Sequence, residues 1–175
     1  MNGNNHALNK KYLIIGGSGY LGSLFLEKLQ KKNVTIYLHL KTKKIKSNKK
    51  NIKFIYGDIT KNSFWKKNII NKDYLISFAS AENTFFNKKR IEDDYKVNVQ
   101  SGVYALINAY NLNKKIKIIF FGSENQEVNL NIKSIKNTGN LPHNFFGFNK
   151  DILERYSIYF KNKLKLKIVF LRFSN

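Results

Sequence analysis

The stretch that decides the fold is Gly16-Gly17-Ser18-Gly19-Tyr20-Leu21-Gly22, which lies between an apolar run and a segment with helical periodicity. The run before it, Tyr12-Leu13-Ile14-Ile15, is typical of a buried strand, and the apolar residues after it recur at helical spacing: Leu21, Leu24, Phe25 and Leu29. Between a strand and a helix, glycines allow a tight turn, close approach of a ligand to the backbone and close helix packing, with a pyrophosphate at the helix N-terminus. The stretch therefore predicts a dinucleotide-binding turn, with an ordinary strand-to-helix turn as the alternative.

The glycine spacing GxxGxxG, with Tyr20 and Leu21 inside it, resembles the extended short-chain dehydrogenase/reductase family, also called the NAD-dependent epimerase/dehydratase family. That family includes nucleotide-sugar epimerases, dehydratases and reductases. The resemblance implies that NAD or NADP is bound by the turn residues Gly16, Ser18, Gly19, Tyr20, Leu21 and Gly22. It also implies hydride transfer between the nicotinamide and a small molecule such as a nucleotide-sugar.

The composition is that of one globular domain. The chain has 175 residues, 42% of them hydrophobic and 14% aromatic, which is enough for a sizeable core. It contains no cysteine, so disulfides and thiolate chemistry are excluded, as expected in a reducing compartment. Residues 1–9 are polar and precede only a strand-length apolar run, so neither a signal peptide nor a membrane span is predicted. We expect a cytoplasmic protein without a membrane partner.

The formal net charge of +21 raises the alternative of a lysine-rich nucleic-acid-binding module. Only Arg90, Arg155 and Arg172 are arginines, and the lysines are scattered among many asparagines and isoleucines. Base recognition favours the planar fork of arginine. We therefore interpret the charge as compositional bias that produces solvated lysine faces, and a nucleic-acid partner is disfavoured.

Apolar periodicity alternates between strands and helices along the chain. Strands are predicted at Lys11–Ile15, Val34–Leu40, Ile52–Tyr56, Tyr74–Ala79, Ile116–Phe121 and Leu166–Leu171, and helices at Tyr20–Lys32, Ile91–Asn111 and Phe145–Lys163. Such alternation indicates an α/β fold, a Rossmann-type doubly wound parallel sheet with helices on both faces. Residues 1–175 are expected to form a single NAD(P)-binding domain, with the ligand at the carboxyl ends of the strands, where the strand order reverses.

The end of the second predicted strand bears on the choice of cofactor. No Asp or Glu occurs between Glu27 and Asp58, and the position where an acid would contact the ribose is surrounded by basic residues: His39, Lys41, Lys43 and Lys44. In the family, a basic residue at this place accompanies NADP. The resemblance therefore favours NADP over NAD, with Lys41 at the 2′-phosphate, although lysines are common throughout this chain.

Three further segments resemble family motifs. Gly57-Asp58-Ile59-Thr60 is similar to the segment whose Asp contacts the adenine amino group, although Gly-Asp after a strand is also ordinary turn chemistry. Leu75–Ala81 is similar to the fourth-strand motif, which places Ala79 and Ser80 beside the cofactor, with Ser77 in place of the usual His. Asn98 occupies the position of the family's structural asparagine, with an exposed mid-helix Asn as the alternative.

The resemblance places catalysis at Ser123, Phe146 and Lys150. Ser123 occupies the position that hydrogen-bonds the reacting sugar oxygen, and Ser123-Glu124-Asn125 lacks the terminal acid of a dehydratase, which disfavours water elimination. Pro142-His143-Asn144-Phe145-Phe146-Gly147-Phe148-Asn149-Lys150 resembles the segment P-x-N-x-Y-G-x-S-K. Lys150 matches the lysine that holds the nicotinamide ribose, and Phe146 stands where the family has its catalytic tyrosine. No metal site is predicted.

Phe146 is the departure that matters most, because phenylalanine has no proton to exchange. A general acid or base contributes about 10²–10⁴ in rate, so normal family chemistry should be severely impaired unless another group substitutes. A substitute role for His143 is disfavoured, since a lone loop histidine is usually exposed. The alternative function is a non-catalytic cofactor-binding relative or a truncated enzyme.

The length of the chain supports the same alternative. Leu171–Asn175 resembles the family's sixth-strand ending, so the resemblance covers about half of a member and lacks the substrate-binding part. The family commonly forms homodimers through the helices that here span Ile91–Asn111 and Phe145–Lys163. A homodimer is therefore an expectation from resemblance alone.

Overall fold

The computed structural model describes residues 9–41, 50–81, 88–123, 126, 142 and 144–173, with the side chains of residues 88–90 excepted. Six parallel strands form one sheet in the order β3-β2-β1-β4-β5-β6. The strands are β1 Lys10–Ile15, β2 Val34–Leu40, β3 Ile52–Tyr56, β4 Tyr74–Ser77, β5 Lys117–Ser123 and β6 Lys167–Phe173. This order is that of the Rossmann fold, so the predicted fold class is confirmed.

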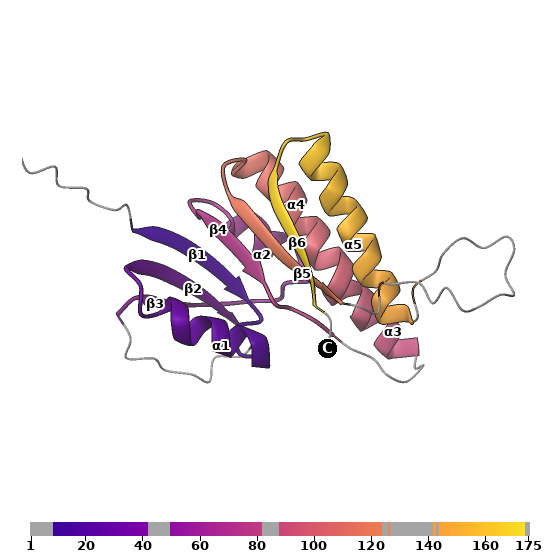
Figure 1. Cartoon of the computed structure of the whole chain (residues 1–175), viewed down its shortest axis with the longest axis horizontal. Helices are drawn as coiled ribbons and strands as arrows, with labels where there is room; N and C mark the ends of the chain where they lie inside the picture. The colour runs from indigo at the N-terminus through magenta and orange to yellow at the C-terminus, as the bar shows by residue number, and fades with distance from the viewer. Residues whose placement is uncertain are drawn as a thin grey trace, which may run out of the picture.

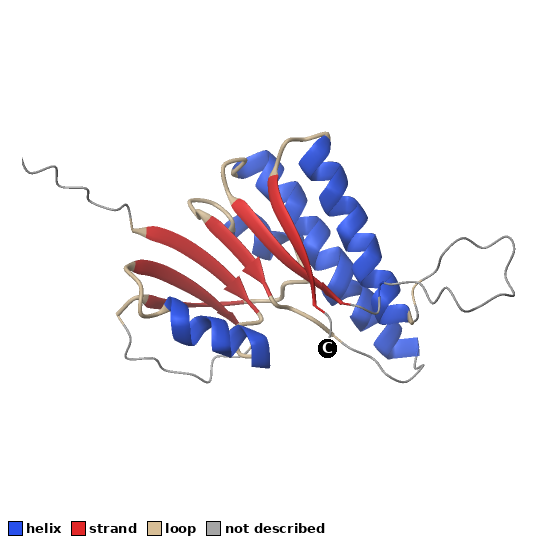
Figure 2. Cartoon of the chain, viewed as in Figure 1, coloured by secondary structure: helices blue, strands red, loops and turns tan. Residues whose placement is uncertain are grey.

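Helices cover both faces of the sheet (Figure 1). They are α1 Tyr20–Leu29, α2 Asn62–Asn68, α3 Lys88–Tyr95, the π-helical segment η1 Lys96–Gln100, α4 Ser101–Leu112 and α5 Phe145–Asn162. The single helix α1 packs on one face, and α2, α4 and α5 pack on the other, which gives the three layers seen in Figure 2. None of the helices among the described residues is both long and apolar enough to cross a membrane.

Alternation along the central strand divides the core into two layers. Leu13 and Ile15 of β1 point toward the helices α2, α4 and α5, whereas Ile14 between them belongs to the cluster that packs under α1. All three side chains are fully buried. A parallel strand covered on both faces needs this continuous apolar sequence, which is why the run before the glycines predicted β1 correctly.

Several element boundaries differ from the sequence prediction. Helix α2 was not predicted, because it has only seven residues and its buried pair Phe64-Trp65 shows no helical repeat. The central helix was predicted as one regular helix, but it contains η1 between α3 and α4. Strand β4 ends at Ser77 rather than Ala79, because the chain then turns away from β1 to pass the glycine turn, whereas β5 and β6 each run two residues past their predicted ends. Helix α1 ends at Leu29 rather than Lys32.

The order of strands reverses between β1 and β4, and the candidate site lies there. Ile15 and Ser77 are paired in register, and the Phe78 amide donates to the Ile15 carbonyl at 2.8 Å. Beyond this point the glycine turn leads to α1 on one face, while the chain after β4 leads toward the other face. The two segments separate at the carboxyl edge of the sheet, which is where such folds bind ligands.

Candidate functional site

Gly16 and Gly22 are required by close backbone packing within the glycine turn. Gly16 has a φ of +72°, and a Cβ on it would lie 2.7 Å from the Ala79 nitrogen. A Cβ on Gly22 would lie 2.4 Å from the Gly16 carbonyl oxygen. Neither position tolerates a side chain, because each obstacle is backbone. These two glycines therefore hold the start of α1 against the ends of β1 and β4.

Gly19 differs from both, because it faces open space. The only atom near a Cβ built on Gly19 is the Gly16 carbonyl oxygen, at an ordinary contact distance of 3.4 Å, among the residues that the structure describes. Gly19 is the N-cap of α1, where no side chain caps the helix and the first turn holds no acid. Ser18, Tyr20 and Leu21 around it are exposed. The first-turn N–H groups of α1 are thus uncapped by side chains, and the turn fits the pyrophosphate of a dinucleotide.

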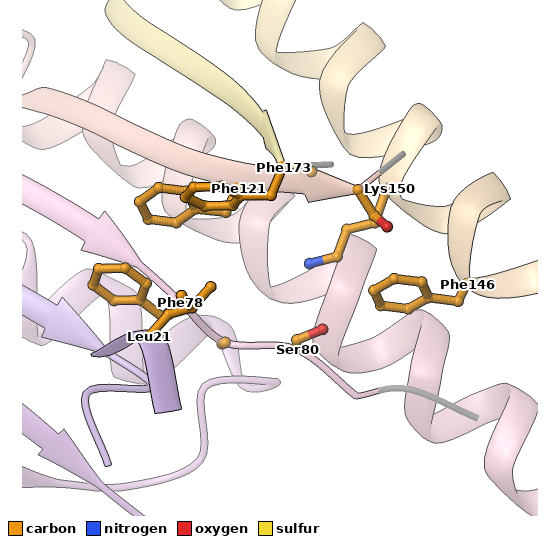
Figure 3. Close-up of a pocket in the computed structure, with 10 residues that line it drawn as sticks. Leu21, Phe78, Ser80, Phe121, Phe146, Lys150 and Phe173 are labelled. Carbon is orange, nitrogen blue, oxygen red and sulfur yellow. The ribbon is translucent and has the colours of Figure 1, made fainter. Parts of the chain in front are cut away.

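A cavity of about 220 Å³ lies beside the turn, at the carboxyl ends of β4, β5 and β6 (Figure 3). Its lining residues come from α1, the segment after β4, the ends of β5 and β6, and α5: Leu21, Phe78, Ala79, Ser80, Phe121, Gly122, Ser123, Phe146, Lys150 and Phe173. The cavity therefore brings together all three predicted catalytic positions and both positions predicted after β4.

Lys150 extends from α5 into this cavity (Figure 3). The residue is only 5% exposed, and its Nζ lies 5.4 Å from the centre of the Phe146 ring. Burial lowers the pKa of the Lys150 ammonium to about 8, although the charge of Asp94 acts in the opposite direction. Lys150 is therefore charged in most molecules at neutral pH but loses its proton far more easily than a surface lysine.

Phe146 lies one turn before Lys150 on the same helix and is 8% exposed. Asn144 caps this helix, since its Oδ1 accepts from the Gly147 amide at 2.8 Å. The cap and the buried ring fix the first turn of α5 in place. The position resembling the family's tyrosine is thus well ordered at the cavity, but it presents a hydrocarbon ring.

Ser123 lines the cavity at the end of β5, where a network that the sequence did not reveal supports it. Its backbone amide donates to Oε1 of Gln126 at 2.8 Å, and Nε2 of Gln126 donates to Glu154 at 2.7 Å. Arg172 of β6 donates to the same Glu154 oxygen at 2.9 Å. Gln126 is buried. Nothing in the local sequence marks it, because its side-chain partner Glu154 lies 28 residues away on α5.

Stacked phenylalanine rings form the apolar wall of the cavity. The sequence did not predict a role for these residues. The rings of Phe78 and Phe121 are 4.6 Å apart, and those of Phe121 and Phe173 are 5.3 Å apart, each pair nearly parallel. Phe25 of α1 packs against Phe78 at 5.5 Å. A planar apolar wall of this kind suits a flat ring better than a flexible polar chain.

Asn98 ties the segment after β4 to the central helix. Its Nδ2 donates to the Ala81 carbonyl at 2.6 Å, and its Oδ1 accepts from the Ala81 amide at 3.3 Å. The residue is buried, so the interpretation as an exposed mid-helix Asn is wrong. Asn98 thereby fixes the backbone that carries Ala79 and Ser80 into the cavity.

The ends of β2 and β3 bring Lys41 and Asp58 near one another. Partial burial acts to raise the pKa of Asp58, but hydrogen bonds from Thr60 and the charges of Lys61 and Lys41 outweigh it and lower the pKa. Thr60 donates to Asp58 Oδ1 from its amide at 2.8 Å and from its hydroxyl at 2.7 Å. Ile59 lies in the same turn, and its carbonyl accepts from Trp65 at 2.7 Å.

The His39 side chain is buried and contacts the protein backbone, so it is not placed to bind a phosphate. Its Nε2 lies 2.8 Å from the Gly57 carbonyl oxygen, and burial lowers the pKa of its imidazole. Of the basic residues predicted around the 2′-phosphate, only Lys41 is exposed at this edge within the described part of the chain. Lys43, Lys44, Glu124, Asn125 and His143 lie outside the described residues. Within the described ranges, no group of three or more potential ligands could hold a metal ion.

The strand order and the cavity at its switch point define a Rossmann-type α/β domain. Residues 12–175 match the sequence model of the NAD dependent epimerase/dehydratase family, and the chain belongs to that family. No protein of curated function matches this sequence.

Solved structures agree with this assignment at the level of the fold. The dTDP-glucose 4,6-dehydratase of Streptomyces venezuelae, with NAD bound, has a TM-score of 0.74 at 14% identity, over 93% of this chain and 55% of its own. The UDP-N-acetylglucosamine 4-epimerase of Methanobrevibacter ruminantium, in complex with UDP-N-acetylmuramic acid, has a TM-score of 0.76 at 22% identity, over 94% and 54%. The UDP-glucose 4-epimerase of Thermotoga maritima, with UDP-glucose, has a TM-score of 0.75 at 21% identity, over 94% and 55%. The chain thus spans about half the length of these structures.

Proposed function

We propose that residues 1–175 form a single NAD(P)-binding domain that takes part in hydride transfer to or from a nucleotide-sugar. The observation that supports this most strongly is the contrast within the glycine turn. Gly16 and Gly22 are packed against backbone, whereas Gly19, at the start of α1 without a side-chain cap, is exposed and a Cβ on it would meet only an ordinary contact. This is the arrangement that a pyrophosphate needs if it is to approach the helix N-terminus.

The remaining cofactor contacts follow the edge of the sheet from β3 to α5. The turn residues Gly16, Ser18, Gly19, Tyr20, Leu21 and Gly22 surround the pyrophosphate, while Asp58 and Ile59 contact the adenine. Lys41 contacts the 2′-phosphate of NADP, for which we propose a preference over NAD. Ala79 and Ser80 face the ribose, and Lys150 holds the nicotinamide ribose. When bound, the nicotinamide supplies or accepts a hydride.

The substrate class is proposed from the family and from the cavity. The matched epimerases of M. ruminantium and T. maritima are described with nucleotide-sugars. In this chain Ser123 lines the same cavity as Phe146 and Lys150, where its hydroxyl suits a sugar oxygen. Phe146 favours the second candidate function, a relative that binds the cofactor without catalysis, because its ring occupies the position of a proton-exchanging hydroxyl.

A homodimer is proposed through the outer faces of α4 and α5. Three large side chains there are well exposed, namely Ile107 at 38%, Tyr156 at 46% and Tyr159 at 56%. An apolar and aromatic surface on two neighbouring helices is typical of an interface. We also propose a cytoplasmic location, on the ground that the chain contains no cysteine.

The replacement Gly19→Val tests the proposed cofactor site. Valine fits the folded turn, because a Cβ at Gly19 meets only an ordinary contact, but its methyl groups occupy the space assigned to the pyrophosphate. We expect the affinity for NADPH to fall by about 100-fold or more, equivalent to about 3 kcal/mol, and the poorer helix N-cap to cost only about 1 kcal/mol of stability. The measurement is a calorimetric titration with NADPH. Ser63→Val, at an exposed position in the first turn of α2, is the matched control. Equal NADPH affinity in the wild type and Gly19→Val would refute the site.

A further inference from the structure

The described lining of the cavity contains one group that can exchange a proton near neutral pH. Among the described residues that line it, Lys150 alone has a titratable side chain. The others are phenylalanines, one leucine, small residues and two serines, whose hydroxyls do not ionise in this range. Among the described lining residues, a reaction in this cavity that moves a proton with each turnover can use only Lys150.

A second ionisable residue lies buried behind Lys150. Asp94, in the last turn of α3, is 0% exposed. Its Oδ1 accepts hydrogen bonds from Asn98 and from Asn149, the latter at 3.0 Å, and Asn149 directly precedes Lys150 on α5. Its Oδ2 has no hydrogen-bond partner among the described residues. A buried carboxylate left half satisfied is costly unless a nearby positive charge stabilises it.

The ammonium group of Lys150 is the positive charge that interacts with the Asp94 carboxylate. The electrostatic attraction of Asp94 favours the ammonium form of Lys150 across the contact between α3 and α5. Neither residue takes part in an ion pair with another described residue. The hydrogen bond from Asn149 holds α5 against Asp94. The carboxylate therefore also positions the backbone from which the Lys150 side chain extends.

We propose that Lys150 is the proton-transfer residue of this site, and that the buried Asp94 is a positioning residue that sets its charge. The proposal rests on the proposed cofactor function and assigns to the lysine the task that Phe146 cannot perform. In the oxidative direction, the neutral amine of Lys150 takes the proton of a substrate hydroxyl and becomes an ammonium. The carbon that bore the hydroxyl becomes a carbonyl carbon, as its hydrogen leaves with its electron pair to an oxidised nicotinamide. In the reverse reaction, the ammonium returns the proton to the oxygen and the reduced nicotinamide returns the hydride to the carbon.

The electrostatic surroundings of Lys150 fit this task. Burial lowers its pKa to about 8, so that about a tenth of the molecules hold the neutral amine at pH 7 and about half at pH 8. Glu154, one turn further along α5, is engaged by Arg172 and Gln126, and Asp151 is engaged by Arg155 at 2.7 Å. From β5 and the segment after β4, Lys150 faces the neutral Ser123 and Ser80. Asp94 is thus the charged group that controls Lys150 from a neighbouring element in the described part of the chain.

Side-chain NMR of the lysine ε-amine tests the proposal without cofactor or substrate. The Lys150 resonance is assigned by its absence in Lys150→Arg, and Lys161→Arg, an exposed position on the same helix, is the control. We expect Lys150 to titrate near pH 8, and Asp94→Asn to lower the pKa of Lys150 further. An ordinary pKa for Lys150, or an unchanged pKa in Asp94→Asn, overturns the proposal.

Turnover and cofactor binding supply the second test, with UDP-glucose and NADP⁺ as probes. Arginine keeps the positive charge but does not release a proton, so Lys150→Arg should lose about 100-fold or more in kcat at saturating NADP⁺. Retained turnover in Lys150→Arg overturns the proposal, as does turnover that is absent from the wild type and created by Phe146→Tyr. If neither the wild type nor Phe146→Tyr reacts, the pKa of Lys150 measured by NMR in the wild type and in Asp94→Asn decides whether the proposal stands. A wild type that fails to bind NADPH contradicts the proposed function instead, and the ε-amine titration separates the two failures.

Discussion

The two halves of the sheet edge differ in how they make their part of the site. On the side of β1 and α1, the turn is made of backbone, and a few consecutive residues determine its shape. On the side of β5, β6 and α5, the cavity is made of side chains that come from several elements far apart in the sequence. The first half can therefore be predicted from the seven residues 16–22 alone. The second half depends on contacts between distant residues, such as that between Asp94 and Asn149.

The two halves also differ in which substitutions they accept without loss of the fold. A side chain at Gly22 would collide with the backbone at 2.4 Å. At position 146, by contrast, phenylalanine packs as a tyrosine ring would, and only the hydroxyl is missing. The binding half is constrained by the fold itself, while the reaction half can lose or exchange a chemical group and keep its packing.

The largest effect is expected for Gly22→Ala. Because the added methyl meets the Gly16 carbonyl oxygen and the Gly17 Cα, which are both backbone atoms, we expect a loss of about 4 kcal/mol in the free energy of unfolding, above the usual range for overpacking. Gly19→Ala, three residues earlier, should cost no more than about 1 kcal/mol, as expected for a weaker helix N-cap. Urea denaturation of the two variants measures the contrast. Equal stability would show that the turn is not constrained by its backbone.

A smaller effect, which depends on pH, is expected for Lys150→Met. The pKa of Lys150 is about 8 in the folded protein against 10.5 as the ordinary value, so between these values the unfolded chain binds more protons and stability rises with pH. Below pH 8 the full penalty of the buried charge, about 3 kcal/mol, is present. Methionine removes this pH-dependent penalty, so the stability of Lys150→Met relative to the wild type should be higher at pH 7 than at pH 10.5, by about 3 kcal/mol. Urea denaturation at several pH values measures it, with Lys161→Met as the control. A constant difference across this range would contradict the assigned burial of charge.

The smallest effect is expected at the far end of the binding half, for Lys41→Glu. Lys41 is exposed, so its contribution to a bound phosphate is partly screened by solvent. We expect the affinity for NADPH to fall by about tenfold, or about 1.4 kcal/mol, while the affinity for NADH stays within about twofold. Competition titrations of both cofactors measure this selectivity. Lys28→Glu on the exposed face of α1 controls for net charge, and a matching loss of NADH affinity in Lys41→Glu would remove the 2′-phosphate assignment.

The fold was predictable where burial leaves a local pattern. The continuous apolar run of β1 and the glycines after it predicted the first strand, turn and helix, and alternation predicted the parallel order. Helix α2 was missed because Phe64 and Trp65 are adjacent and the helix is too short to show a period. The π-helical segment η1 was missed because it leaves no mark on the apolar spacing of the central helix.

The candidate site was predictable only in part, for the same physical reason. Motif order placed Ser123, Phe146 and Lys150 at one cavity, where the structure brings them together. Asp94 could not be singled out, because it stands in the charged run Glu92-Asp93-Asp94, which is typical of a solvated helix face, and two of these three acids are indeed exposed. Gln126 was equally hidden, since its side-chain partner Glu154 lies on the distant helix α5. Burial of a polar residue by distant elements leaves no local signal.

A titration of the unmodified chain with NADPH tests the central claim, that the binding half of this site is intact although the reaction half lacks its tyrosine. The account predicts saturable binding of one NADPH per chain, with a Kd on the order of 10 μM, or about −7 kcal/mol. The absence of saturable binding up to about 1 mM, which corresponds to about −4 kcal/mol, would contradict it.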